Sequence, residues 1–383
     1  MEYYFNEDHQ LFRQSMREFL HREVAPHLDD WEAAGEVPKS VFRKMGEMGY
    51  FGLALPEQFG GSEADFFFSV IFFEELERIN SGGFAAAMGA HAYLALPHIE
   101  TEGSEALKEK YLRKGISGEM VGCLAISEPS GGSDVAEMRT RAERAGDEWV
   151  INGEKIFITN GVNSDFIVLA AKTAPDKGAH GISLFVVDRE TPGVSAIVLK
   201  KLGWHASDTG QLAFDNVRVP TGNLLGMENA GFMYIMQRFA LERLVVAIGA
   251  VAMADHALEV TLRYMQERQA FGRPINKFQV LRHEIAQMAS EIEAQRAYVY
   301  YLCRCYQDGH NVVKEAAMSK MLTTDLCDKV VYNCLQYHGG YGYMEDYPLA
   351  RMFRDSRLGP IGGGTNEIMR EIIAKMTIEK TIY

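Results

Sequence analysis

Apolar residues recur every three or four positions through the first 120 residues, which is the spacing of amphipathic helices. Asn6, followed by an acidic pair, predicts a helix start, and Pro38 predicts a second helix that ends near Gly49. The first helix runs to Pro26 with an apolar face made of Leu11, Phe12, Met16, Phe19 and Leu20. Further helices are expected over 66–79, with Glu74, Glu75 and Glu77 toward solvent, and over 84–99 and 105–112. This region reads as all helix.

The pattern changes near Val121, where short runs of alternating apolar and polar residues begin. Residues 148–151 and 155–159 flank Asn152-Gly153, a pair that favours a two-residue hairpin turn. Other strands are expected over 166–170, 182–187, 194–198, 211–214 and 217–219. Short strands at regular spacing indicate a small β-barrel or sandwich.

Helical spacing returns near Gly231 and continues almost to the end of the chain. Two long stripes stand out, one with Leu241, Leu244, Ile248, Val251, Leu258, Leu262 and Met265, the other with Phe278, Leu281, Ile285, Met288, Ile292, Val299, Leu302 and Tyr306. With the helical segments 313–337 and 367–376, they predict an antiparallel four-helix bundle. The sequence therefore predicts an α+β multidomain protein. Its parts are an N-terminal helical domain (1–120), a central β domain (121–227) and a C-terminal helical bundle (228–383).

Charge and composition narrow the function. The formal net charge of the 383-residue chain is −13, which argues against nucleic-acid binding because phosphate contacts need basic patches. Neither 66–73 nor 244–253, the richest apolar segments, is long or uniform enough to predict a membrane span. The acidic, aromatic N-terminus resembles no targeting segment, so we expect a cytoplasmic, bacterial or already mature protein. The five cysteines form no CxxC pair and the eleven histidines show no ligand spacing, so no metal site is predicted.

The stretch Leu124–Asp134, LAISEPSGGSD, lies at the boundary between the first helices and the strands. Its glycine pair lets the backbone approach a flat or phosphorylated ligand, and Ser127 and Ser133 supply hydroxyl groups beside it. An ordinary surface turn has the same composition. Alone, the stretch leaves both interpretations open.

In its context the stretch resembles the first signature of the acyl-CoA dehydrogenase family, although Glu137 replaces a small residue at its end. Four further stretches agree in order over nearly the whole chain: 154–161 (EKIFITNG), 267–273 (ERQAFGR), 336–343 (QYHGGYGY) with Asp346, Arg351 and Asp355, and 361–367 (IGGGTNE). The resemblance implies that FAD accepts a hydride from the β-carbon of an acyl-CoA thioester after a base removes the α-proton. The product would be the trans-2-enoyl-CoA.

The base is not where most of the family carries it. The usual glutamate position in the C-terminal segment is Gly363, but long-chain and branched-chain members carry the base on a helix of the bundle instead, where this chain has Glu242. The resemblance thus implies Glu242 as the base, Arg243 as its support and the Gly363 N–H as a donor to the thioester carbonyl. A solvent-exposed glutamate in helix-surface ion pairs is the alternative for Glu242. The substrate contacts implied are Ser133, Phe239, Glu242, Arg243, Gly363 and Gly364.

The same resemblance assigns the FAD contacts. Leu124, Ile126 and Ser127 would meet the isoalloxazine edge, Gly132 and Ser133 would close over the cofactor, and Phe157 and Thr159 would flank the ring. Phe157 stands where many relatives have tryptophan. Contacts to the FAD of a neighbouring subunit would come from Arg268, Phe271, Gln279, Gln336, Gly339 and Gly340, with Thr365 and Glu367 completing the pyrophosphate and adenine side.

Since FAD would be shared between subunits, the resemblance implies a homotetramer, built as a dimer of dimers. The expected partners are an acyl-CoA and an electron-transfer flavoprotein, in fatty-acid β-oxidation. Residues 89–98 would form the acyl-pocket floor, and the absence of arginine there favours a neutral chain. Three alternatives remain: an acyl-CoA oxidase, a nitroalkane-oxidase-like enzyme, and a non-catalytic flavin-binding relative.

Overall fold

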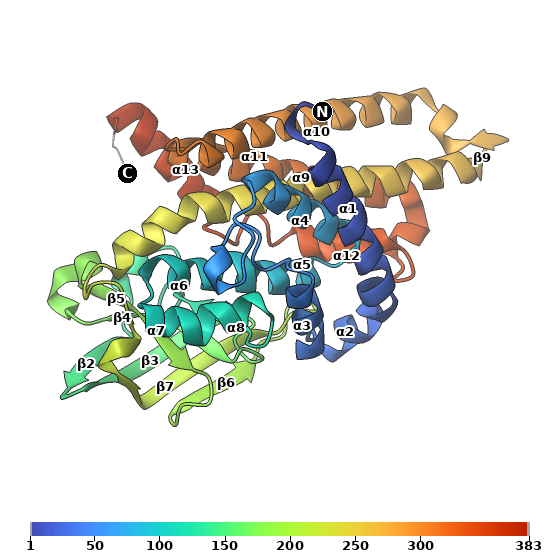
Figure 1. Ribbon diagram of the computed structural model, residues 1–383. Helices are drawn as coiled ribbons and strands as arrows, with labels where there is room; N and C mark the ends of the chain where they lie inside the picture. The colour runs from blue at the N-terminus through green and yellow to red at the C-terminus, as the bar shows by residue number, and fades with distance from the viewer. Residues whose placement is uncertain (1, 381–383) are drawn as a thin grey trace.

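The computed structural model describes residues 2–380 and arranges them as three regions (Figure 1). Three long C-terminal helices form one side of the molecule, the N-terminal helices lie in the middle, and the β domain lies on the opposite side. One apolar core runs from the N-terminal helices into the C-terminal helices and one face of the sheet. The predicted order of helical, β and helical regions is confirmed.

The N-terminal region is helical, as predicted. Its helices are α1 (Glu7–Phe19), α2 (Leu28–Ala34), α3 (Lys39–Glu47), α4 (Phe66–Arg78), α5 (Gly82–Gly89), α6 (Leu96–Glu102), α7 (Glu105–Leu107) and α8 (Arg113–Ile116). A π-helical segment, Ala90–Ala95, joins α5 to α6. Asn6 caps α1, accepting a 2.9 Å hydrogen bond from the His9 N–H.

Two details of this region differ from the prediction. Leu11 is 66% exposed and lies outside the apolar face of α1. Glu74, Glu75 and Glu77 on α4 do not point to solvent. The Glu74 side chain is 14% exposed and lies 2.7 Å from Arg13. Glu75 is buried, because Arg13 and Arg17 of α1 bind its carboxylate at 3.0 and 2.8 Å. Glu77 is partly buried against α9.

The β domain is one eight-stranded sheet with an apolar core of its own. Its strands are β1 (Gly122–Ala125), β2 (Arg141–Ala145), β3 (Glu148–Thr159), β4 (Phe166–Lys172), β5 (Ile182–Asp188), β6 (Val194–Val198), β7 (Thr209–Pro220) and β8 (Leu224–Leu225). The order is β6-β7-β3-β2-β4-β5-β8, with β1 parallel to β4. Among the described residues the pairings do not join β6 to β8, so no closed barrel forms.

The predicted hairpin at Asn152-Gly153 is wrong. Residues 148–159 form one strand, β3, and the turn lies earlier, at Gly146-Asp147 between β2 and β3. The pairing register of β3 and β7 shifts between Ile151 and Gly153, which is a β-bulge. A Cβ at residue 153 would lie 2.4 Å from the Thr140 hydroxyl, so this glycine serves close packing.

The C-terminal region contains α9 (Gly231–Glu267), α10 (Gln279–Gln307), α11 (Val313–His338), α12 (Pro348–Ser356) and α13 (Asn366–Ala374). The hairpin of β9 (Gln269–Ala270) and β10 (Arg273–Pro274) joins α9 to α10 at one end of the molecule (Figure 1). By length and composition α9 could cross a membrane, contrary to the prediction, but most of its apolar window is buried inside the protein. A soluble core helix has the same character.

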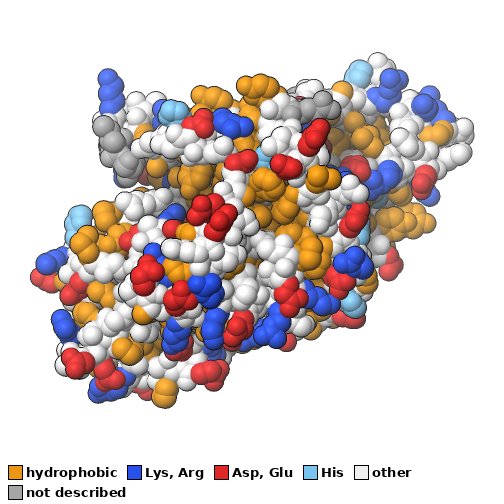
Figure 2. Space-filling view, in the orientation of Figure 1, with side chains coloured by type: hydrophobic (Ala, Val, Ile, Leu, Met, Phe, Trp, Pro, Cys, Tyr) orange, Lys and Arg blue, Asp and Glu red, His pale blue; other side chains and the backbone are white. Residues whose placement is uncertain are grey.

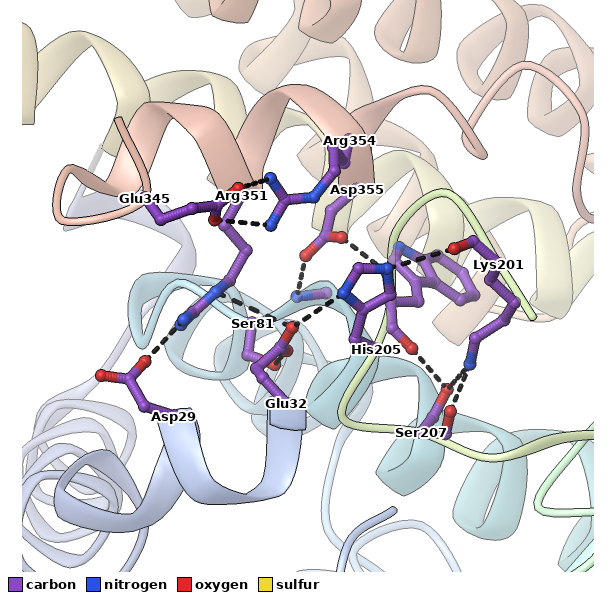
Figure 3. A network of polar contacts seen from close by, with 12 residues as sticks. Asp29, Glu32, Ser81, Lys201, His205, Ser207, Glu345, Arg351, Arg354 and Asp355 are labelled. Carbon is purple, nitrogen blue, oxygen red and sulfur yellow. Dashed lines mark hydrogen bonds and ion pairs between the residues drawn. The ribbon is translucent and has the colours of Figure 1, made fainter. Parts of the chain in front are cut away.

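Polar contacts join the three regions behind the bundle (Figure 3). The Asp355 carboxylate of α12 accepts hydrogen bonds from the Gly82 N–H of α5 at 3.0 Å and the Trp204 N–H of the β6–β7 connection at 2.6 Å. Arg351, one turn earlier, lies 2.6 Å from Asp29 of α2. Asp355 and Arg351, one acidic and one basic position of the predicted second signature, therefore hold the regions together.

Candidate active site

The carboxyl group of Glu242 lies against Gly363. Glu242 is on α9, whereas Gly363 is in the loop that precedes α13. A Cβ at residue 363 would lie 3.7 Å from Glu242 Oε1 and 3.6 Å from Val246 Cγ2. Gly363 has φ +63°, which strains residues with a side chain. The carboxyl group on α9 thus occupies the space beside a backbone position that favours glycine.

The surroundings of Glu242 raise its pKa, chiefly through burial, while the nearby cations of Arg243 and Lys320 oppose that shift. The side chain nevertheless keeps some accessible surface, as does Val246 one turn later, although their neighbours on α9 are buried. This combination fits the wall of an internal site better than a closed core. The solvent-exposed alternative for Glu242 is not what the structure shows.

The loop before α13 is fixed from α11. Lys320 is fully buried, and its Nζ donates to the Gly364 carbonyl at 2.8 Å and to Asn366 Oδ1 at 3.0 Å. Asn366 also donates to Asp325 at 2.8 Å. The Thr365 hydroxyl caps α13 by accepting from the Ile368 N–H. The backbone at Gly363 and Gly364 is therefore held rigidly next to Glu242.

The loop that follows β1 is fixed by a buried ion pair. Lys155 Nζ of β3 lies 2.8 Å from Glu128 Oε1 and donates to the Ile126 carbonyl at 3.0 Å. Glu128 also accepts from the backbone N–H of Arg139 and of Thr140, at 2.5 and 2.9 Å. These donors and Lys155 lower the pKa of Glu128 against the opposing effect of burial. Beyond this anchor, Gly132 and Ser133 are exposed.

Several predicted ring contacts gather at this loop. The Ser127 carbonyl accepts a 2.9 Å hydrogen bond from the Ile156 N–H, which places Ser127 next to Phe157. Phe157 has φ +62° and is 68% exposed, and the β3–β7 register shifts around it. Leu124 and Ile126 are half-buried, and Thr159 ends β3 opposite Thr209. An exposed aromatic ring here offers a surface for stacking.

A second group of predicted residues meets elsewhere. Arg268, Gln336, Gly339 and Gly340 line one concavity of about 450 Å³, together with Tyr264, Ile275, Tyr337, His338, Tyr341 and Met344. The Arg268 guanidinium lies 5.6 Å from the centre of the Tyr341 ring and makes no ion pair with any carboxylate among residues 2–380. Phe271, at the tip of the β9–β10 hairpin, is 94% exposed, and Gln279 is exposed at the start of α10. Glu367 is exposed in the first turn of α13.

The structure does not bring the two groups together. Figure 1 places the β9 hairpin at the end of the long helices that points away from the β domain. Arg268 directly precedes β9, whereas Phe157 belongs to β3 of the β domain. One chain therefore holds these two groups of predicted residues at separate places.

The predicted acyl-pocket floor, residues 89–98, lies in α5, the π-helical segment and α6. His91 is fully buried there. Its Nε2 lies 2.9 Å from the Gly115 carbonyl, and its Nδ1 accepts from the Gly122 N–H at 3.0 Å. Burial lowers the pKa of His91 to about 4, so the ring is neutral. His91 is a structural residue that fastens α8 and β1 to this segment.

Two anchoring lysines were given no role from the sequence. In the sequence analysis Lys155 belongs to the motif 154–161, and no motif contains Lys320. For Lys155 a signal was available: Trp149 and Ile151 point inward on β3, so strict alternation places Lys155 on the same face. For Lys320 the signal was weaker, a single cation on a face of α11 with Ser319, Thr323 and Thr324, which are also buried.

The helical, β and helical regions, with a carboxyl group beside a rigid glycine loop, define the fold of a flavin-dependent acyl-CoA dehydrogenase. The chain matches the acyl-CoA dehydrogenase N-terminal domain over residues 6–119, the middle domain over 123–217 and the C-terminal domain over 229–378. The chain belongs to the acyl-CoA dehydrogenase family.

Relatives match along the entire chain. The mouse mitochondrial long-chain specific acyl-CoA dehydrogenase is 38% identical over 98% of this chain and 87% of its own length. An acyl-CoA dehydrogenase of Bacillus subtilis (strain 168) is 39% identical over 97% of this chain and 98% of its own. The crystal structure of an acyl-CoA dehydrogenase from Geobacillus kaustophilus superimposes with a TM-score of 0.96 at 41% identity, covering 98% and 99% of the two chains.

The family uses FAD, and a glutaryl-CoA dehydrogenase from Mycobacterium smegmatis, solved in complex with FADH2, superimposes with a TM-score of 0.93 at 26% identity. The residues of this chain fit such a cofactor. The exposed ring of Phe157 offers a stacking surface for the isoalloxazine ring. Arg268, which lines the concavity, offers a cation for the pyrophosphate.

Proposed function

We propose that the protein converts an acyl-CoA to the trans-2-enoyl-CoA, with Glu242 as the catalytic base. The reaction removes a proton from the α-carbon and a hydride from the β-carbon, and FAD, when bound, accepts the hydride. The single observation that carries this proposal is the contact of the Glu242 carboxyl group with Gly363. It puts a proton acceptor beside the loop from which a backbone N–H would bind the thioester.

The electrostatics of Glu242 suit that role. A carboxylate whose pKa is raised by burial takes a proton more readily than an exposed one. Arg243 and Lys320 oppose the effect of burial and so favour the ionised carboxylate that a base needs. Arg243 is buried with its guanidinium 5.2 Å from the centre of the Phe239 ring. We assign Arg243 to support the base, and Phe239 to the wall of the substrate site.

Backbone donors would polarise the thioester. We assign the Gly363 N–H to the thioester carbonyl, where charge develops as the α-proton leaves. The neighbouring Gly364 would contact the same substrate, and Lys320 would keep both N–H groups in place through its bond to the Gly364 carbonyl. Ser133, on the exposed part of the loop after β1, would contact the pantetheine arm.

Each FAD would be shared by two subunits. We assign its ring to Leu124, Ile126, Ser127, Gly132, Ser133, Phe157 and Thr159 of one chain. The pyrophosphate and adenosine parts fall to Arg268, Phe271, Gln279, Gln336, Gly339, Gly340, Thr365 and Glu367, mostly of its neighbour. The separation of these two groups of residues in one chain supports this assignment. Exposed apolar side chains on α10 and α11 also favour a tetramer: Val280, Tyr301, Leu322 and Tyr332. Figure 2 shows orange side chains at the surface of this helical layer.

The electron acceptor would be an electron-transfer flavoprotein, in cytoplasmic β-oxidation. A chain in a solved structure named for the electron transferring flavoprotein of Acidaminococcus fermentans is 35% identical to this chain, covering 99% of this chain and 100% of its own. A chain of this fold thus occurs in a structure that concerns such a flavoprotein, which supports the choice of acceptor. The substrate would carry a neutral acyl chain, since the floor segment 89–98 holds no arginine or lysine.

The test is an anaerobic titration of the yellow holoenzyme with butyryl-CoA, octanoyl-CoA, palmitoyl-CoA and isovaleryl-CoA. Bleaching at the flavin absorbance maximum by at least one thioester supports the proposal. Turnover in air with peroxide formation would point to an oxidase, and bleaching by a nitroalkane alone would point to that class. A protein that stays yellow with every thioester contradicts the dehydrogenase function.

A further inference from the structure

Glu77 of α4 carries a carboxyl group without a partner in the protein interior. Its side chain makes no hydrogen bond or ion pair with any residue between 2 and 380, and Oε2 is fully buried. Burial, and after it the nearby Asp355 carboxylate, raise the pKa of Glu77 to about 8. Glu75, two residues earlier, is neutralised by two arginines. An uncompensated interior carboxyl group needs another explanation.

The carboxyl group of Glu77 faces the helix that carries the base. A Cβ at Gly249 of α9 would lie 3.1 Å from Glu77 Oε1. Residues 242, 246 and 249 follow the i, i+4, i+7 spacing, so Glu242, Val246 and Gly249 share one face of α9. At 1.5 Å of rise per residue, Gly249 lies about 10 Å along the helix from Glu242. Glu77 therefore lies at the far end of the stripe that begins at the reacting centre.

The predicted acyl-pocket floor borders the same space. Phe73 precedes Glu77 by one turn of α4, and its ring centre lies 4.7 Å from that of Tyr93. A Cβ at Gly89 would lie 3.1 Å from the Phe73 ring. Residues 89–93 thus meet the α4 face that presents Glu77. Glu77 as a whole residue keeps some accessible surface, as Glu242 does, so neither lies in a completely closed part of the core.

From these contacts we infer that Glu77 ends the acyl-chain site and selects acyl-CoAs whose chain carries a terminal hydrogen-bonding group, such as an ω-hydroxyl. The inference rests on the proposed dehydrogenase function. A plain methyl end leaves the carboxyl group unsatisfied, whereas a terminal hydroxyl both accepts a hydrogen bond from it and donates one to it. At neutral pH the carboxyl group is mostly protonated, which suits it as a donor.

The distance of about 10 Å along α9 from Glu242 to Gly249 sets the length of the acyl chain that reaches Glu77. An extended chain advances about 1.2 Å per bond, since three backbone bonds span about 3.5 Å. Seven bonds from the α-carbon reach the oxygen of an ω-hydroxyoctanoyl chain, and one hydrogen bond of about 2.8 Å then closes the remaining gap to Glu77. A butyryl chain is too short to reach it.

The experiment measures kcat/KM of the holoenzyme for ω-hydroxyoctanoyl-CoA, octanoyl-CoA and butyryl-CoA, with an electron-accepting dye. The variants are Glu77→Leu, which removes the polar group, and Glu77→Gln, which keeps a donor and an acceptor. Gly249→Ala, which favours the helix, adds a methyl group beside Glu77 and guards against a folding defect at residue 77.

We expect the wild type to prefer the ω-hydroxyoctanoyl over the octanoyl thioester by about tenfold, as one satisfied buried polar group predicts. Glu77→Leu should reverse that preference, Glu77→Gln should keep it, and Gly249→Ala should lower both octanoyl rates while sparing butyryl-CoA. The inference about Glu77 is overturned if the wild type prefers octanoyl-CoA, or if Glu77→Leu leaves the ratio of kcat/KM for the ω-hydroxyoctanoyl and octanoyl thioesters unchanged. Neither result affects the proposed dehydrogenase function. Failure to oxidise any of these thioesters, and also palmitoyl-CoA and isovaleryl-CoA, overturns the proposed function along with it.

Discussion

Glu242 on α9 and Gly363 before α13 are in contact, with Oε1 3.7 Å from the place that a Cβ at residue 363 would take. Two segments more than 100 residues apart in sequence thus build one reacting centre. The glycine lets the loop approach the carboxyl group and adopt a positive φ, and Lys320 holds the loop there.

The first prediction concerns pH. Since burial raises the pKa of Glu242 above the ordinary 4.5 of a glutamate, the base is lost as pH falls through that raised value. The acid limb of kcat/KM should therefore lie at a higher pH than an exposed glutamate would give. A pH–rate profile with a substrate that has no titrating group of its own measures it. A limb at or below pH 4.5 would show that Glu242 is solvated or is not the base.

The second prediction concerns the buried pair of Lys155 and Glu128, whose side chains are 0% and 3% exposed. Lys155→Met should leave Glu128 without its cation and lower the free energy of unfolding by about 3–5 kcal/mol. The loop that holds Ser127 should loosen, so the flavin content of the purified protein should fall. Urea unfolding and the flavin-to-protein absorbance ratio measure both effects.

A double variant, Lys155→Met with Glu128→Gln, serves as the control for that experiment. It removes both charges and should recover part of the lost stability. Equal stability of Lys155→Met and wild type would mean that the pair does not anchor the loop.

The third prediction concerns the shared cofactor. Glu242→Gln and Arg268→Asp should each be inactive as pure oligomers, the first for lack of a base and the second for lack of a cation at the pyrophosphate. In a mixture refolded or co-expressed at equal amounts, about a quarter of the activity should return. If the two variant chains pair at random, half of the dimers contain one chain of each variant. Such a dimer has one site with both Glu242 and Arg268 and one site that lacks both. No recovery, with mixed oligomers demonstrated by tagging, would mean that one chain supplies both groups of residues to its FAD.

The fourth prediction concerns stability and Glu77. Its folded pKa of about 8 lies above the ordinary value, so the stability that its protonated form contributes is full below about pH 4.5 and is lost as pH rises through 8. Asp355 and Cys327 also lie near Glu77. Burial raises the pKa of Asp355 to about 6 and raises the pKa of the Cys327 thiol well above its ordinary value. Glu77→Gln should therefore gain in Tm relative to wild type between pH 5 and pH 9. A constant difference would mean that Glu77 ionises normally.

The sequence predicted the fold well where the periodicity was long. The stripe through Leu241, Leu244 and Ile248 placed α9. Four of the motif positions, Arg268, Gln336, Gly339 and Gly340, line one concavity. The sequence-based prediction failed where contacts between residues far apart in the chain decide the local structure. Asn152-Gly153 has the composition of a turn, yet β7 pairs along β3 on both sides of it and turns it into a bulge. Glu75 and Glu77 have the polarity of a surface, yet two arginines of α1 bury the first and α9 covers the second.

The measurement that tests the central claim most directly is stopped-flow reduction of the flavin by an acyl-CoA that bleaches the wild type, repeated with Glu242→Gln. The variant should bind FAD and acyl-CoA as the wild type does, because the amide replaces the carboxyl group with little change in shape. Its rate of bleaching should fall by about 10²–10⁴, the range for removal of a general base. Bleaching as fast as wild type would show that another residue removes the α-proton.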